Sequence, residues 1–141
     1  MKIAYNACYG GFGLSPLAIT EYAKAHGATL TWYQRGYGDN KKYTRVNDDF
    51  DTAGVLYNAL TRNCGAELNE IPKEFYYYRS FDDDNDRCDP ILIDIIERLG
   101  NEANGRFAKL AIAEIPDGVA FEITEYDGLE DVVPPRMKWQ Y

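Results

Sequence analysis

A glycine-rich segment at residues 9–13 constrains the fold most strongly. It follows an apolar stretch at 3–7 that predicts a first β-strand, and it precedes a helix start at Ser15-Pro16. Glycine allows positive φ angles and close approach of another molecule, and successive N–H groups before a helix N-terminus form a concave anion site. This order favours a phosphate or another small anion bound by the backbone, with a tight turn packed on a neighbouring strand as the alternative.

The spacing of the glycines, Gly10, Gly11 and Gly13, matches neither the Rossmann fingerprint nor the end of a P-loop. The segment therefore indicates a kind of site without identifying its ligand.

Two main helices are expected. The first begins with Ser15 as N-cap and Pro16 at the first helical position, and it ends at Gly27. The second begins at Asp89-Pro90 and ends at Gly100. The inner face of the first helix is predicted to comprise Leu17, Ile19, Tyr22 and Ala23. The apolar stripe of the second comprises Ile91, Leu92, Ile95, Ile96 and Leu99.

Several short segments predict β-strands. They are residues 3–7, 29–33, 75–78, 107–115, 119–126 and 129–133. Pro116-Asp117-Gly118 predicts a hairpin between 107–115 and 119–126, with Val119, Phe121 and Ile123 facing inward, and Asp127-Gly128 predicts a second turn.

Residues 36–51 are polar and indicate a long surface loop, and 55–60 weakly favours a helix. We therefore expect a single α+β domain over 1–141, with a mostly antiparallel sheet, two main helices and a variable excursion at about 36–69.

Charge and cysteine content exclude several classes of protein. A net charge of −8 over 141 residues argues against duplex nucleic acid or an anionic membrane as a partner. Three cysteines without C-x-x-C spacing argue against disulfides and zinc, and they favour a reducing cytoplasm. No signal peptide and no apolar run of roughly 18 residues is present, so a soluble intracellular protein is expected. The 12 tyrosines suit a binding surface or a subunit interface, and tyrosine is also a common strand residue.

Catalytic and metal chemistry lack suitable residues. Cys8 has no evident base, because the one histidine, His26, lies at the far end of the first helix, so a buried structural cysteine is the favoured interpretation. The acidic run 81–86 lacks the ligand order of an EF-hand loop and indicates a solvated turn. We expect no catalytic residue, no metal and no cofactor.

Three arginines lie close to aromatic residues. They are Arg79, Arg106 and Arg136, and the neighbouring aromatic residues are Tyr78, Phe107 and Trp139. A guanidinium group stacks on flat bases and binds phosphate through two donors, and aromatic rings stack on bases. Together with the glycine segment they indicate a nucleotide-like ligand. Surface ion pairs are the alternative, given 23 acidic residues against 15 basic ones.

A set of motifs resembles a family of small phage proteins. The motifs are Cys8–Ser15, Tyr77-Tyr78-Arg79, Asp89-Pro90, Asn104–Ala108, Glu114–Asp117, Glu125–Gly128 and the tail from Arg136 to Trp139. As a set they resemble the Thoeris anti-defence sponges, which bind and sequester glycocyclic ADP-ribose signals made by bacterial TIR proteins. The resemblance covers most of the chain outside about 36–69.

The resemblance implies roles for particular residues. Arg79 and Phe107 would sandwich an adenine, and Arg136 would hold a phosphate. Asp117 stands near a position where the family can carry an asparagine, so that contact is in doubt. With the glycine segment, the expected ligand-binding residues are Gly10, Gly11, Phe12, Gly13, Arg79, Phe107, Asp117 and Arg136.

The expected function is therefore that of a phage anti-defence sponge, not an enzyme, acting in the cytoplasm of the infected bacterium. Its partner would be glycocyclic ADP-ribose, with cyclic oligonucleotides as a further ligand class, and the resemblance implies a homodimer or a larger homo-oligomer. A small nucleotide hydrolase or phosphodiesterase, and a structural protein-interaction module, are the alternatives.

Overall fold

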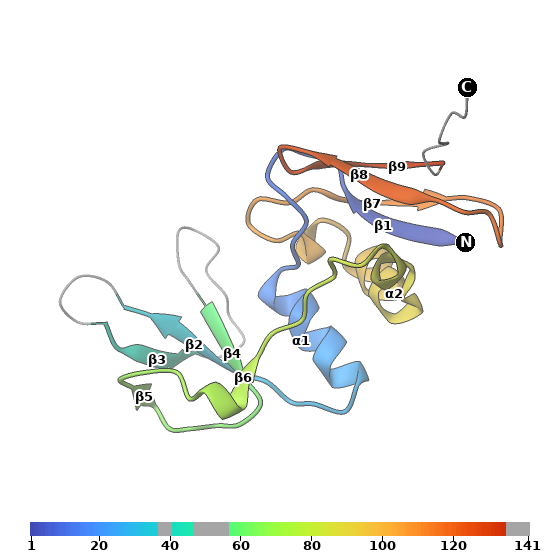
Figure 1. The fold of residues 1–141 in the computed structure, drawn as a ribbon. Helices are drawn as coiled ribbons and strands as arrows, with labels where there is room; N and C mark the ends of the chain where they lie inside the picture. The colour runs from blue at the N-terminus through green and yellow to red at the C-terminus, as the bar shows by residue number, and fades with distance from the viewer. Residues whose placement is uncertain (37–40, 47–56, 135–141) are drawn as a thin grey trace. The chain divides into compact units, whose positions relative to one another are not determined.

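The structure is a computed structural model that describes residues 1–36, 41–46 and 57–134 (Figure 1). The chain divides into two compact units. The first comprises residues 1–18 and the chain from Phe81 onward, and the second comprises Ile19–Ser80. The described residues form an α+β fold with two α-helices and several antiparallel sheets, as the sequence predicts. The single domain over 1–141 stays a prediction.

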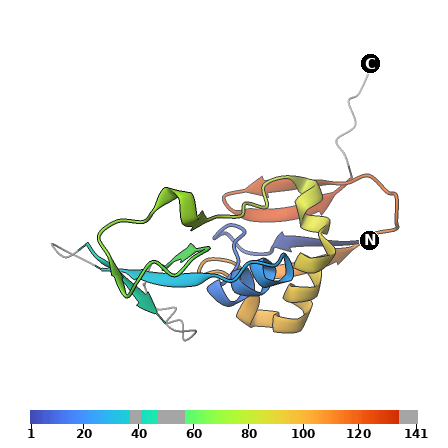
Figure 2. The same ribbon diagram turned by 90° about the horizontal axis from the view of Figure 1, so that it is seen from below.

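The first unit contains two antiparallel strand pairs and one helix. β1 (Lys2–Asn6) pairs with β7 (Leu110–Glu114), with Lys2 opposite Glu114 and Asn6 opposite Leu110. β8 (Glu122–Tyr126) pairs with β9 (Leu129–Val133). Both β9 and α2 (Pro90–Leu99) contact β1, and Figures 1 and 2 show the β8–β9 hairpin running along β1. Short 3₁₀ helices flank α2 at Asp84–Cys88 and Gly100–Ala103.

The hairpin predicted at Pro116-Asp117-Gly118 is wrong, because β7 pairs with β1 and β8 pairs with β9. The hairpin turn is instead Asp127-Gly128, whose φ angles of 52° and 88° are both positive. A two-residue loop with two positive φ angles matches the twist of paired strands. Val119, predicted to face inward, is exposed. Turn residues thus predict where the chain reverses, but they do not predict which strands pair.

Both helices begin and end where their capping residues indicate. In α1 (Pro16–Ala25) the Ser15 hydroxyl accepts a hydrogen bond from the Ala18 N–H at 3.1 Å, and Gly27 follows the helix with a φ of +81°. In α2 the Asp89 carboxylate accepts a hydrogen bond from the Ile91 N–H at 2.9 Å. The buried side chains of α2 are Leu92, Ile93, Ile95 and Ile96.

The predicted inner face of α1 needs one correction. Ala18, Tyr22 and Ala23 are buried, whereas Leu17 is exposed. The error arises because positions 17 and 18 are 100° apart around a helix, so a short apolar pattern fits more than one facing direction.

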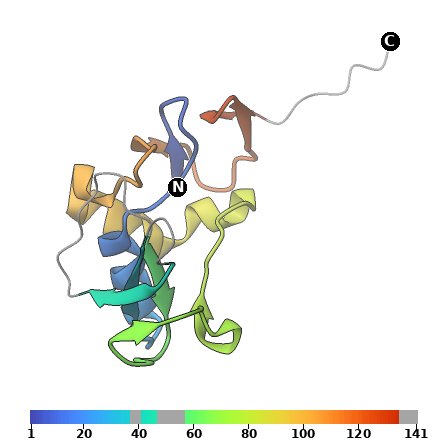
Figure 3. The same cartoon turned by 90° about the vertical axis from the view of Figure 1, so that its left-hand side faces the viewer.

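The second unit contains a five-stranded antiparallel sheet in the order β5-β3-β2-β4-β6 (Figures 1 and 3). The strands are β2 (Thr31–Arg35), β3 (Tyr43–Val46), β4 (Tyr57–Leu60), β5 (Glu67–Leu68) and β6 (Tyr76–Tyr77), and a 3₁₀ helix at Lys73–Phe75 precedes β6. The fully buried Tyr33 lies on the central strand, and its hydroxyl donates to the Gly65 carbonyl at 2.8 Å and accepts from the Cys64 N–H at 3.0 Å.

Two predictions in this region are wrong. The polar loop expected at 36–51 contains β3, and the helix weakly favoured at 55–60 is β4 over its described residues, 57–60. The excursion expected at about 36–69 therefore supplies β3, β4 and β5 to the sheet. These strands are too short to show a clear alternation. Their pairing determines their structure: β3 and β4 pair with β2, and β5 pairs with β3.

Candidate functional site

The glycine segment packs against residues 105–107 of the chain. A Cβ on Gly10 would lie 1.7 Å from the Phe107 carbonyl oxygen, so only glycine fits at this position. A Cβ on Gly105 would lie 2.8 Å from the Gly13 carbonyl, and the Gly105 N–H donates to the Gly13 oxygen at 2.9 Å. The alternative predicted from the sequence is a tight turn packed on a neighbouring strand. The glycines do pack closely on another part of the chain, but residues 105–107 precede β7 and form no strand.

The three glycines of the segment differ in what their backbone requires. Gly11 has a φ of +94°, which L side chains rarely adopt. Gly13 has no positive φ, and a Cβ built there meets nothing within 4 Å. A Cβ on Gly128 would lie 2.5 Å from the Tyr9 carbonyl oxygen, so the β8–β9 turn also packs against the glycine segment.

The N–H groups of residues 9–13 donate no hydrogen bond to any described part of the chain. Backbone donors without an intramolecular partner bond to water or to a ligand. A run of five such donors fits the anion site that the sequence predicts, although the contact itself stays a prediction.

A buried polar network lies behind the segment. Arg87 and Glu130, both about 7% exposed, form a two-bond ion pair with distances of 2.7 and 2.9 Å. Arg87 also donates to the Phe81 carbonyl at 2.7 Å, and Glu130 accepts the Asn6 N–H at 2.8 Å. The Asn6 side chain, fully buried, bonds to the carbonyls of Cys8 and Gly128. This network holds the start of the glycine segment and the β8–β9 turn together.

Phe12 covers this network. Its ring lies 3.7 Å from the Arg87 guanidinium carbon and 6.1 Å from the ring of Phe81. Because the ring already stacks on a buried cation, Phe12 has a packing role, and its expected contact with a ligand stays a prediction. Sequence analysis missed Arg87, Glu130 and Asn6, because their partners lie 43 and 124 residues apart along the chain.

Large aromatic side chains are exposed in the glycine segment and in the two turns that pack against it. Tyr9, Phe107 and Tyr126 are 64%, 65% and 78% exposed. The guanidinium carbon of Arg106 lies 4.9 Å from the centre of the Phe107 ring. The backbone of Phe107 is fixed by its close approach to Gly10 and by the Cys8 thiol, which donates to its carbonyl at 3.2 Å. Phe107 thus combines a fixed backbone with an exposed ring.

The structure does not test the expected roles of Arg79 and Arg136. Arg79 belongs to the second unit, where it donates to the Ser80 carbonyl at 2.7 Å and its guanidinium lies 6.0 Å from the ring of Tyr22. Phe107 belongs to the first unit, so the sandwich with Arg79 stays a prediction. Arg136 lies outside the described residues.

Asp117 lies at the opposite end of the β1–β7 ribbon from Phe107. Phe107 precedes β7 beside the end of β1, whereas Asp117 follows β7 and contacts Met1. A five-residue strand separates these ends by about 13 Å. The structure therefore places Asp117 away from the glycine segment.

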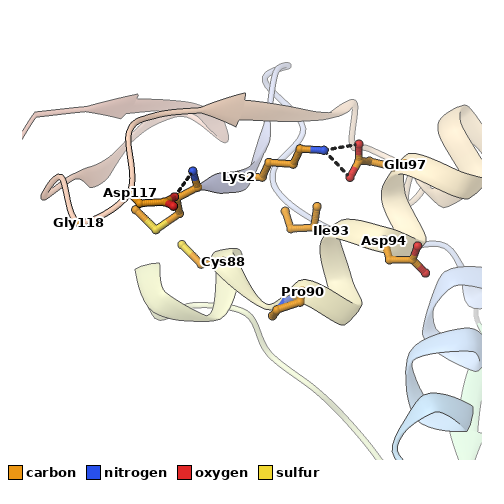
Figure 4. Close-up of a pocket in the computed structure, with 9 residues that line it drawn as sticks. Lys2, Cys88, Pro90, Ile93, Asp94, Glu97, Asp117 and Gly118 are labelled. Carbon is orange, nitrogen blue, oxygen red and sulfur yellow. Dashed lines mark hydrogen bonds and ion pairs between the residues drawn. The ribbon is translucent and has the colours of Figure 1, made fainter.

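Asp117 borders an open pocket of about 510 Å³ between the start of β1 and α2 (Figure 4). The Met1 amine donates to its carboxylate at 2.7 Å and lowers the pKa of Asp117, and Lys2 bonds to Glu97 at 2.9 Å. Asp94 lines the pocket as a third carboxylate. Because Met1 and Lys2 are already paired and three acidic residues line this space, the pocket is poorly suited to a phosphate.

Among the described residues no group of three or more histidine, cysteine or carboxylate side chains could hold a metal ion. No described helix is long and apolar enough to cross a membrane. The three cysteines, Cys8, Cys64 and Cys88, are free and half-buried. Burial and the nearby Asp84 raise the pKa of the Cys88 thiol.

The α+β class follows from the strands and helices described above. No protein-family model matches the chain, and no curated protein and no solved structure matches it significantly.

Proposed function

We propose that this protein binds and sequesters a cyclic nucleotide signal without cleaving it. The observation that carries the proposal is the exposed Phe107 ring, fixed at its backbone beside the glycine segment. An exposed aromatic ring stacks on a base, and unpaired backbone donors bond to phosphate. The resemblance to the Thoeris anti-defence sponges specifies glycocyclic ADP-ribose as the ligand and the cytoplasm of an infected bacterium as the compartment.

In this proposal the other residues take the roles that the resemblance implies. Arg79 lies on the second face of the adenine, and Arg136 holds a phosphate. The network of Arg87, Glu130 and Asn6 fixes the backbone that presents the donors. A nanomolar complex needs about −12 kcal/mol, which a stacked base and several charge-assisted bonds to phosphate supply together. The exposed tyrosines suit the expected homo-oligomer, which light scattering would detect.

Sequestration requires that the ligand be released unchanged. The Cys8 thiol donates to the Asn6 side-chain oxygen at 3.4 Å and to the Phe107 carbonyl at 3.2 Å, and neither group is a base that activates a nucleophile. We expect Cys8→Ser to leave ligand capture intact. Mass spectrometry of the ligand after overnight incubation and heating checks this point. Turnover beyond one ligand per site that Cys8→Ser abolishes would identify an enzyme instead.

The binding test uses calorimetry with glycocyclic ADP-ribose isomers on three variants. Phe107→Ala should weaken binding by about 1–3 kcal/mol, the usual value of a base stack, and it should fold normally because the ring is 65% exposed. Gly13→Ala should fold normally because its Cβ enters open space, and the added methyl group should obstruct a phosphate at the segment. Val119→Ala, an exposed apolar residue, is the control.

Gly11→Ala is a poorer test, because its φ of +94° strains the backbone whether or not a ligand is bound. Wild-type protein that binds no nucleotide would contradict the proposal and favour a protein-interaction module. Full affinity in Gly13→Ala together with a loss in Phe107→Ala would remove the glycine segment from the site and keep the stack.

A further inference from the structure

Arg106 and Phe107 form the tip of one tight turn. The Ala108 N–H donates to the Gly105 carbonyl at 3.0 Å, so Arg106 and Phe107 are the two central residues of a β-turn. The turn is anchored to the glycine segment on both sides, by the bond from the Gly105 N–H to the Gly13 oxygen and by the contact of Gly10 with Phe107. Both side chains are exposed.

Arg106 differs from the other described arginines of the first unit. Arg87 is buried against Glu130, and Arg98 bonds to Asp94 at 2.9 Å. Arg106 makes no ion pair and no hydrogen bond to the described residues, and its guanidinium carbon lies 4.9 Å from the centre of the Phe107 ring. In a chain with a net charge of −8, a cation that pairs with no carboxylate of the described residues is available to an anionic ligand.

The position of the Arg106 guanidinium beside the Phe107 ring also suits a phosphate. A guanidinium carries its N–H donors within its own plane, and those donors match the oxygens of a phosphate in pairs. The contact with Phe107 limits the motion of the side chain, which lowers the entropy lost on binding. Phe107 is 65% exposed, which leaves ring surface for a base.

We infer that Arg106 binds a phosphate of the nucleotide whose base stacks on Phe107. The inference rests on the proposed function, and it deepens it by assigning the charge-pairing group within the first unit. The ligand class is a purine nucleotide with a phosphate or diphosphate, not a neutral nucleoside. Arg106 is a binding residue in this arrangement. Its turn is anchored to the glycine segment, which carries the N–H groups of residues 9–13.

The experiment compares wild type, Arg106→Ala and Arg106→Lys by calorimetry with glycocyclic ADP-ribose at two salt concentrations, with Arg98→Ala as an exposed control. Losing a hydrogen-bonded charge should weaken binding roughly 10- to 100-fold, and Arg106→Lys should recover part of the loss. The dependence of affinity on salt should be smaller in Arg106→Ala, because one charge pair is gone. Adenosine, which lacks phosphate, should bind wild type and Arg106→Ala within about 3-fold of each other.

Each other outcome contradicts a defined part of the inference. If wild type binds the nucleotide and Arg106→Ala binds it equally well with the same salt dependence, the assignment of Arg106 is wrong and the proposed function stands. If Arg106→Ala loses affinity for adenosine as much as for the nucleotide, Arg106 acts by orienting Phe107, and the phosphate contact is wrong. If wild type binds no nucleotide, both the inference and the proposed function fail.

Discussion

Glu130→Gln removes one charge from the network behind the glycine segment while keeping the size of the side chain. The glutamine oxygen still accepts a hydrogen bond from the Asn6 N–H. The glutamine NH₂ group replaces the oxygen that accepted from Arg87, so two donors then face each other. Arg87 is then left buried without a counter-charge. Breaking one side of a buried ion pair costs about 3–5 kcal/mol, and the remaining oxygen places the expected loss near the lower limit, about 3 kcal/mol.

The matched control is Glu97→Gln, which removes the same charge from the exposed pair with Lys2, where both side chains are more than two-fifths exposed. Exposed pairs contribute about 0–1 kcal/mol. Urea unfolding followed by circular dichroism measures the free energy of unfolding of both variants. The double variant Arg87→Met/Glu130→Gln removes the buried charge and should be more stable than Glu130→Gln alone. Equal stability of Glu130→Gln and Glu97→Gln would refute the reasoning.

Two further predictions follow from single contacts. Gly10→Ala places a Cβ 1.7 Å from the Phe107 oxygen and should lower the free energy of unfolding by at least about 1–3 kcal/mol. Gly13→Ala should change the free energy of unfolding by less than about 1 kcal/mol. Thermal unfolding compares the two variants, and equal melting temperatures would contradict the close approach of Gly10 to Phe107. Burial and Asp84 raise the pKa of the Cys88 thiol, so iodoacetamide at pH 8 should alkylate Cys88 more slowly in the folded protein than in urea. Peptide mass spectrometry measures the rate of alkylation. An equal rate in both conditions would contradict the direction of the pKa shift.

Local features of the structure were predictable because their causes are local. A cap needs one side chain within three residues of the helix start, so Ser15 and Asp89 identify both helices without knowledge of the rest of the fold. The strand that follows Asp127-Gly128 was predictable for the same reason, since the turn and its flanking residues form the hairpin alone.

The partners of the strands were not predictable. β1 pairs with β7 across more than 100 residues, and the short strands β3 and β4 take their structure from β2. The exposed side of α1 at Leu17 was misjudged because burial depends on what packs against the helix.

The sequence by itself determined the α+β class, the helix ends and the presence of a glycine turn after the first strand, because these depend on neighbouring residues. Tertiary structure decided that Gly10 is required by Phe107, that Asp117 lies at the other end of the ribbon, and that Arg87 is a buried partner of Glu130. Close approach, charge pairing and burial are properties of segments that meet in space, and nothing in the local order of residues encodes which segments meet.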